Sequence, residues 1–122
     1  MSKLVVLITS HVEKGLEVAE AWQASGAPGV TLIDSHGLHR LQEKSRDLEL
    51  PVFVSMASVL RQLETTSQVI LSVVEDQEVE RLIQAASDVL GDLYQPDTGL
   101  VFVMDVERVI GLRYHRGMKD AP

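Results

Sequence analysis

The sequence contains no cysteine among its 122 residues. This absence excludes disulfide bonds, thiolate zinc ligands and thiol nucleophiles, and it fits a protein of the reducing cytoplasm. Aromatic residues make up only 4% of the chain. Long hydrophobic runs are also missing: the two longest, Leu4–Ile8 and Leu100–Met104, have five residues each and are far too short to span a membrane. We therefore expect a cytoplasmic protein without direct membrane insertion.

Basic residues are scarce relative to acidic ones. Eleven lysines and arginines stand against 18 aspartates and glutamates, a formal net charge of −7. Nucleic-acid binding needs a cationic face that displaces counterions from phosphates, so we expect no nucleic-acid partner. Between residues 75 and 97 there are seven carboxylates and one arginine. We interpret these carboxylates as a solvated helix face rather than a metal site, because no histidine accompanies them.

Motifs of known catalytic machinery are absent as well. The chain has no phosphate-binding glycine loop, no dinucleotide-binding fingerprint and no nucleophile elbow. His36 and His39 flank Gly37, but a metal site would need further ligands, such as His11 or His115, in a defined geometry. An exposed histidine pair explains the spacing better. The sequence therefore predicts a protein that is not an enzyme and holds no metal.

The first part of the chain reads as strand, helix, strand. Lys3–Thr9 is short, branched and apolar, which is typical of a buried strand. Ser10–Glu13 matches a capping box, and the helix that follows should end at Ser25–Gly26. After the turn at Pro28–Gly29, Val30–Ser35 predicts a second strand. The apolar stripe of the helix consists of Leu16, Ala19 and Trp22, with Val18 beside them.

The last part repeats this plan. Ser67–Val74 predicts a strand, Asp76 a helix N-cap, and Leu100–Met104 a final strand after the loop Tyr94–Gly99. Val109–Leu112 is predicted either to extend the sheet or to form another short strand. The helix between them has the apolar stripe Val79, Leu82, Ile83, Ala86, Val89 and Leu90.

Two β-α-β units joined by a connection predict a single α+β domain over residues 1–122 with the ferredoxin-like βαββαβ sandwich. In this fold an antiparallel sheet carries both helices on one face. Two helices cannot cover the other face, so we expect that face to pack against further copies of the chain.

The connection Gly37–Thr66 is unusually long for a compact domain. Within it, Leu48–Val54 has the pattern of an edge strand and Ser58–Glu64 that of a short helix. A self-packed flap and a partner-binding loop both fit. Because apolar side chains on a loop are costly in water, we favour contact with a protein partner through Leu50, Val52, Phe53, Val54 and Met56.

Residues 99–113, Gly-Leu-Val-Phe-Val-Met-Asp-Val-Glu-Arg-Val-Ile-Gly-Leu-Arg, resemble the carboxy-terminal signature of the PII signal-transduction proteins. Residues 26–32 and 73–79 resemble two further family segments. The resemblance implies a homotrimer that binds ATP or ADP in clefts between subunits. It also implies a target-binding T-loop over 37–66, a B-loop over 91–99 and a C-terminal tail over 113–122.

The resemblance also assigns residues to the nucleotide cleft. Leu7 and Val73 would be apolar walls for the purine, and the Thr31 hydroxyl would meet the ring edge. The backbone would approach the ligand at Gly37 and Gly99, and Arg113 would reach a phosphate group. The full predicted set is Leu7, Thr31, Gly37, Arg40, Val73, Gly99 and Arg113.

Other cleft positions depart from the family pattern. Leu100 replaces a phosphate-binding lysine, Asp97 stands in the glycine-rich run, and Gly111 replaces an arginine. Leu41 and Ser67 replace a T-loop glutamine and lysine, and the modified tyrosine has no counterpart. Each lost cationic contact removes roughly 1.5–3 kcal/mol. We therefore predict weak ATP binding. The alternatives are a trimeric interaction module without a ligand and a metal-responsive trimer similar to the CutA family.

Overall fold

The computed structural model describes residues 1–36, 67–96 and 98–112. The predicted order of strand, helix, strand, connection, strand, helix, strand is confirmed. Predictions for residues 37–66, 97 and 113–122 lie outside the described residues. The described elements are β1 (Ser2–Thr9), a 3₁₀ turn η1 (Val12–Lys14), α1 (Gly15–Ala24), β2 (Thr31–Ser35), β3 (Ser67–Glu75), a 3₁₀ turn η2 (Asp76–Glu78), α4 (Val79–Leu90) and β4 (Leu100–Asp105).

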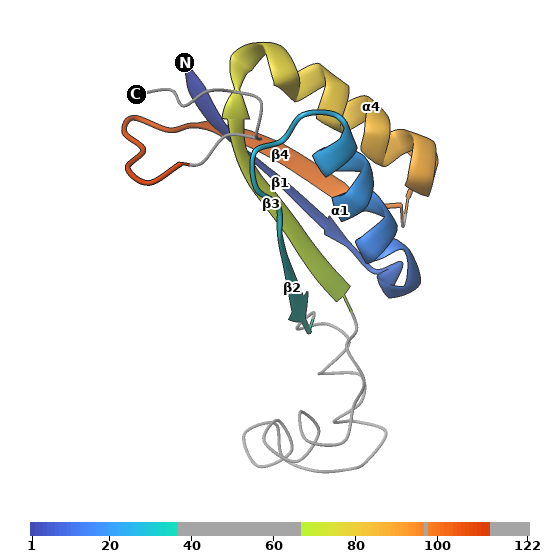
Figure 1. The fold of residues 1–122 in the computed structure, drawn as a ribbon. Helices are drawn as coiled ribbons and strands as arrows, with labels where there is room; N and C mark the ends of the chain where they lie inside the picture. Colours follow the sequence, from blue (N-terminus) through green and yellow to red (C-terminus); the bar gives the residue numbers. More distant parts are fainter. Residues whose placement is uncertain (37–66, 97, 113–122) are drawn as a thin grey trace, which may run out of the picture.

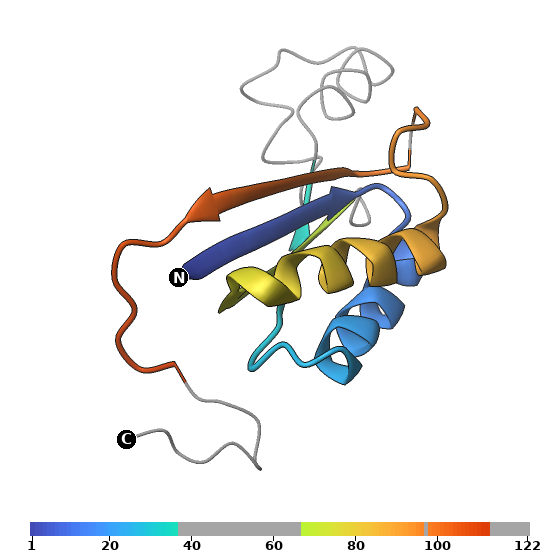
Figure 2. The same ribbon diagram turned by 90° about the horizontal axis from the view of Figure 1, so that it is seen from above.

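The four strands form one antiparallel sheet in the order β2-β3-β1-β4. The register places Leu7 of β1 opposite Ile70 of β3 and Val101 of β4. Both helices pack on the same side of the sheet, which gives the molecule two layers (Figures 1 and 2). This is the ferredoxin-like sandwich that the sequence predicts.

The core lies between the sheet and the two helices. Alternate residues of each strand point toward the helices, as the pleat requires. The indole nitrogen of Trp22 in α1 donates to the carbonyl oxygen of Leu82 in α4 at 2.9 Å, so a fully buried hydrogen bond joins the helices. The buried cluster consists of Val5, Leu7, Val18, Trp22, Ala27, Ile70, Val74, Val79, Leu82 and Ala86.

Both predicted helix caps are wrong. The residue that precedes the turn Val12–Lys14 is His11, not Ser10. Its backbone N–H donates to Thr9 Oγ1 at 3.1 Å. Asp76 likewise lies inside a 3₁₀ turn that precedes α4. In both places a 3₁₀ turn leads into the α-helix and brings its own hydrogen bonds, which displaces the helix start by a few residues.

The buried face of α1 also differs from the predicted stripe. Leu16 lies in the first turn of the helix and is exposed, whereas Val18 and Trp22 are fully buried. These two residues are four apart and therefore share one side of the helix. The predicted end of the helix is confirmed, since Ser25 caps it and Gly26 follows with a φ of +109°.

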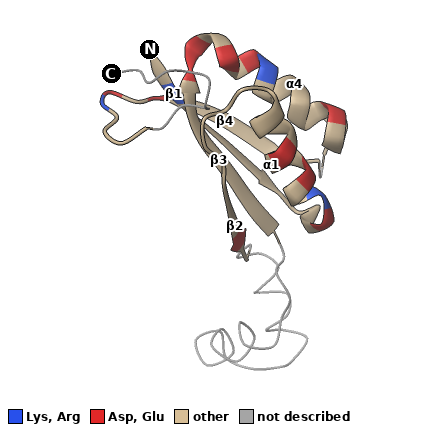
Figure 3. Cartoon of the chain, viewed as in Figure 1, with Lys and Arg blue, Asp and Glu red and all other residues tan. Residues whose placement is uncertain are grey.

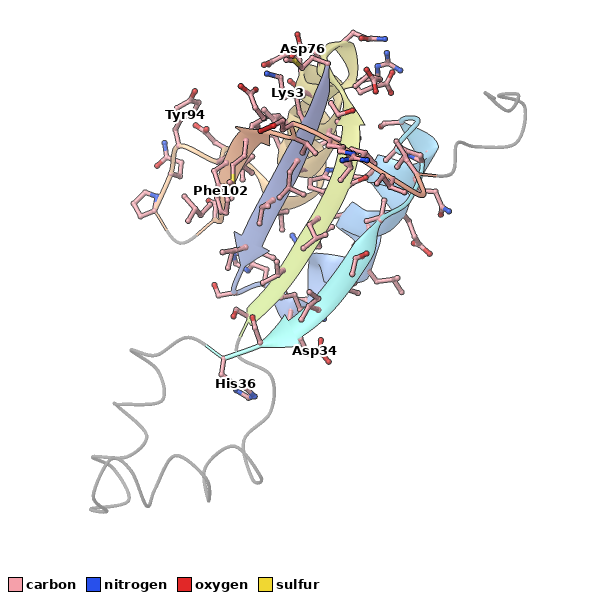
Figure 4. The ribbon with its side chains drawn as sticks, turned by 90° about the vertical axis from the view of Figure 1, so that its left-hand side faces the viewer. Lys3, Asp34, His36, Asp76, Tyr94 and Phe102 are labelled. Carbon is pink, nitrogen blue, oxygen red and sulfur yellow. The ribbon has the colours of Figure 1, made fainter. Side chains whose placement is uncertain are left out.

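No strand forms over residues 109–112 of the described chain. Strand β4 ends at Asp105, and the N–H of Val106 donates to Ser2 O at 3.0 Å. Gly111 then adopts a φ of +94°, a left-handed conformation that interrupts extended pairing. The segment after β4 instead crosses the sheet toward β2, as Figure 4 shows.

The sheet face opposite the helices, here called the open face, carries exposed apolar side chains. In β1, Val6 lies between the core residues Val5 and Leu7, so its side chain points to the open face. Phe102 of β4 pairs with Val6 and therefore lies on the same face. In Figure 4 the strands lie in front of the helices and Phe102 is labelled on β4. Exposed members of this face are Ile33 (45%), Leu100 (58%), Phe102 (39%) and Met104 (52%).

Candidate functional site

A pocket of about 440 Å³ lies where the start of β2 meets the middle of β3 and the segment after β4. Thr31 lies opposite Leu71 in the sheet and supplies a hydroxyl to a mostly apolar wall. This volume is within the range of small-molecule sites. The lining residues are Pro28, Gly29, Thr31, Leu71, Ser72, Val73, Gly111 and Leu112.

A second group of predicted residues lies at the other edge of the sheet. An ideal Cβ built on Gly99 would lie 3.3 Å from both Ile8 O and Leu7 Cδ1. Neither neighbour can move easily, because Leu7 is fully buried and Ile8 is paired in the sheet. Backbone therefore packs directly on β1 here, and any larger residue at position 99 would force one of these neighbours to shift by a few tenths of an ångström.

The turn before this contact is held by hydrogen bonds. The N–H of Tyr94 donates to the carboxylate of Asp92 at 2.9 Å, and the N–H of Gln95 donates to Asp92 O at 3.0 Å. The Tyr94 side chain is 97% exposed and projects from this side of the molecule (Figure 4). At the end of the loop, Thr9 Oγ1 donates to Thr98 O at 3.0 Å.

The structure thus divides the predicted cleft into two groups. Thr31 and Val73 line the pocket beside β2, whereas Leu7 and Gly99 contact each other beside β4. Strands β2 and β4 are the two opposite edges of the sheet, so one chain does not bring these groups together. The remaining predicted cleft residues, Gly37, Arg40 and Arg113, lie outside the described residues, as do the predicted partner contacts Leu50, Val52, Phe53, Val54 and Met56.

Sequence reasoning missed part of the pocket. Pro28 and Gly29 were predicted only as a turn, and Leu112 only as part of a strand, yet all three line it. Ser72 offered a signal, because it is a single hydroxyl inside the apolar run of β3. Its hydroxyl donates to Gly29 O and so connects the strand to the pocket wall.

The ends of β2 and β3 that lead into the long connection form a polar patch. The hydroxyls of Ser35 and Ser67 lie 2.7 Å apart, and Gln68 Nε2 donates to Asp34 Oδ1 at 2.8 Å. His36 Nδ1 and Gln68 Oε1 are buried without a hydrogen-bond partner among the described residues. Figure 4 shows Asp34 and His36 at this end of β2.

Acidic residues dominate the helix layer of the described chain (Figure 3). At the end of the sheet, Lys3 forms an ion pair with Asp105 and lies 4.0 Å from Asp76 Oδ1. The hydrogen bond between Lys3 and Asp105 raises the pKa of the lysine and lowers the pKa of the carboxyl group. Within the described ranges, no three metal-ligating side chains cluster, and no helix is long and apolar enough to cross a membrane.

Comparison with known proteins identifies the family. The family model described as "Nitrogen regulatory protein P-II" matches residues 1–116. The chain therefore belongs to the P-II family of nitrogen regulatory proteins. Proteins of this family are signalling proteins rather than enzymes. A search of curated proteins finds no significant match.

Solved structures confirm the fold. CPII from Thiomonas intermedia K12, a nitrogen regulatory PII-like protein bound there to ADP, AMP and acetate, is 15% identical with a TM-score of 0.56, and the match covers 93% of each chain. A PII-like signaling protein from Thermus thermophilus is 14% identical, with a TM-score of 0.54 and coverage of 86% and 85%. GlnK of B. subtilis in complex with ATP is 16% identical, with a TM-score of 0.53 and coverage of 86% and 81%.

Proposed function

We propose that this protein is a homotrimeric PII-like regulator that binds an adenine nucleotide with few phosphates and acts on a partner protein through residues 37–66. The observation that carries the proposal is the division of the cleft. Its two halves lie beside β2 and β4, at opposite edges of one sheet. Side-by-side assembly would place the β2 half of one chain against the β4 half of the next. The apolar open face supplies the surface for that assembly.

The chemistry of both halves favours a ligand with little charge. The described pocket wall is largely apolar, with the Thr31 hydroxyl as its side-chain donor beside β2. At the β4 half, Leu100 is 58% exposed where a lysine would be expected to bind phosphate. A purine ring fits the apolar wall, whereas a triphosphate lacks a cation at this position. We therefore expect adenosine monophosphate to bind at least as tightly as ATP.

Isothermal titration calorimetry with adenosine, AMP, ADP and magnesium ATP tests this ligand. The variant Leu100→Lys should raise the affinity for ADP and ATP by roughly tenfold, because one charge-assisted hydrogen bond contributes about 1.5 kcal/mol. The matched control is Gln84→Lys, which adds the same charge on the exposed face of α4. An equal gain in both variants would show that net charge alone is responsible. Tighter binding of magnesium ATP than of AMP to the unmodified protein would refute the proposed preference.

The proposed partner surface is tested by deletion. Replacing residues 41–64 with a short Gly-Ser linker should leave the oligomer intact and abolish partner binding. The linker joins the chain beyond the ends of β2 and β3, whose pairing ends at Ser35 and Ser67. A protein that is captured by the full chain but not by the deletion variant is the candidate partner. It should then bind the full chain when both proteins are purified and mixed. If the deletion unfolds the domain, the segment belongs to the core and this part of the proposal fails.

The alternatives have separate signatures. A pure interaction module would bind the partner and no nucleotide at millimolar concentration. A metal-responsive trimer would show metal-dependent shifts of histidine resonances.

A further inference from the structure

Buried hydroxyl groups are rare in the described part of the chain, and their placement is informative. The polar residues buried there are Thr9, Ser72 and Thr98, at 1%, 2% and 8% exposure. A buried hydroxyl destabilises a core unless it finds a hydrogen-bond partner. The hydroxyls of Thr9 and Ser72 each donate to the backbone carbonyl of a loop residue.

Thr9 ends β1 and points to the helix side of the sheet. Its hydroxyl donates to Thr98 O at 3.0 Å and accepts the N–H of His11 at 3.1 Å. One side chain therefore joins the end of β1, the approach to α1 and the residue before Gly99. Because Thr98 is itself buried, its carbonyl oxygen has poor access to replacement water.

Ser72 performs the same task at the other half of the cleft. It lies in β3 between two core residues of the same face, Ile70 and Val74, where an apolar side chain would pack well. Its hydroxyl instead donates to Gly29 O. Gly29 is exposed and forms part of the pocket wall just before β2. A hydrogen bond from the core thus fixes a loop that borders the pocket.

We propose that Thr9 and Ser72 are positioning residues, each holding one of the two loops that frame the nucleotide cleft. Thr9 holds Thr98 and Gly99 against β1, and Ser72 holds Gly29 beside Thr31. The consequence for ligand binding rests on the proposed function, whereas the two tethers are properties of the single chain. Both hydroxyls are replaceable by apolar groups of similar shape, so the roles can be tested without a large change of volume.

Hydrogen exchange measured by NMR on the full chain tests the tethers directly. Thr9→Val should accelerate exchange at His11 and at residues 98–100 by about tenfold, as expected for loss of one hydrogen bond. It should leave the amides of residues 29–32 unchanged. Ser72→Ala should accelerate exchange at residues 29–32 and leave 98–100 unchanged, with a smaller effect because Gly29 is open to water. Each variant is the matched control for the other.

Thr9→Ser keeps the hydroxyl and should restore the exchange rates of the unmodified protein. Uniform acceleration across the core in both variants, or no local acceleration in either, would overturn the proposal. If Thr9→Val does not fold, the unmodified protein provides the measurement. A slowly exchanging Thr9 hydroxyl proton with scalar coupling to the Thr98 carbonyl carbon supports the tether, and its absence refutes it.

Calorimetry with AMP then tests the consequence for the cleft. Thr9→Val and Ser72→Ala should each weaken binding by about three- to tenfold, with Thr9→Ser close to the unmodified protein. Unchanged affinity in both variants, with exchange accelerated locally, would refute a role in ligand binding. If the unmodified protein binds no nucleotide, the proposed function fails, while the exchange measurements still decide whether the tethers exist.

Discussion

The substitution Phe102→Glu should dissociate the proposed trimer. Phe102 lies on the open face of β4 and is 39% exposed in the single chain. Taking roughly 200 Å² for a complete aromatic side chain, about 80 Å² would be removed from water on assembly. At about 25 cal/mol per Å², this area contributes about 2 kcal/mol per chain and about 6 kcal/mol per trimer. The assembly constant should therefore fall by roughly four powers of ten, before the cost of burying the new carboxylate is added.

Multi-angle light scattering at micromolar concentration measures this change. The unmodified chain should have three times the 13.5-kDa chain mass, and Phe102→Glu the mass of one chain. Val103→Glu is the matched control, because Val103 is 38% exposed on the opposite face of the same strand. Circular dichroism confirms that each variant is folded. A trimeric Phe102→Glu, or dissociation by Val103→Glu alone, would refute the assignment of the open face as the interface.

Two further predictions concern stability. Trp22→Phe removes the fully buried indole donor to Leu82 O and part of the core volume, so unfolding in urea should lose about 2–3 kcal/mol without a change in slope. A loss below about 0.5 kcal/mol would show that the helix-to-helix hydrogen bond is unimportant. The pair of Lys3 and Asp105 should make stability depend on pH, because their hydrogen bond lowers the carboxyl pKa and raises the lysine pKa. The contribution of Asp105 to the free energy of unfolding is present above the pKa of the unfolded aspartate and is lost as pH falls through the pKa of the folded state. At high pH, the contribution of Lys3 is lost as pH rises through the pKa of the folded lysine. Lys3→Met should flatten the acid limb measured by thermal unfolding, and an acid limb identical to that of the unmodified protein would contradict this.

The fold was predictable because the strands and helices have strong periodic patterns. The short apolar runs that begin at Leu4 and Leu100 form one of the two central strands and one edge strand, with bounds displaced by one or two residues. Gly26 marked the end of the first helix and adopts a positive φ, as Gly91 does at the end of α4. The helix starts were not predictable, because a 3₁₀ turn and a capping box compete for the same polar residues. Leu16 lies in the first turn of α1 and is exposed, although its spacing from Trp22 had placed it on the apolar stripe.

The candidate site was less predictable for a topological reason. The spacing of residues along one helix or strand predicts which of them share a face. It does not predict which elements meet, and the pocket combines the start of β2, the middle of β3 and the segment after β4. Thr31 and Val73 were found through family resemblance and lie together. Leu7 was found in the same way and lies in the core of its own chain, against Gly99. The periodic pattern of a strand does not distinguish a residue that lines the pocket from one that is buried in the core.

The hydroxyls of Thr9 and Ser72 show what sequence patterns do contain about the site. Ser72 lies inside the apolar run of β3 and Thr9 ends β1, and neither breaks its strand, because a serine or threonine can satisfy its own hydrogen bond locally. Neither residue was singled out from the sequence, since either would also suit a strand end or an exposed face. The structure shows their role through their hydrogen-bond partners. Thr9 donates to the carbonyl oxygen of Thr98, next to Gly99, and Ser72 donates to that of Gly29, close to Thr31. A single hydroxyl inside or at the end of an apolar strand is therefore a usable sign that a nearby loop needs a fixed position.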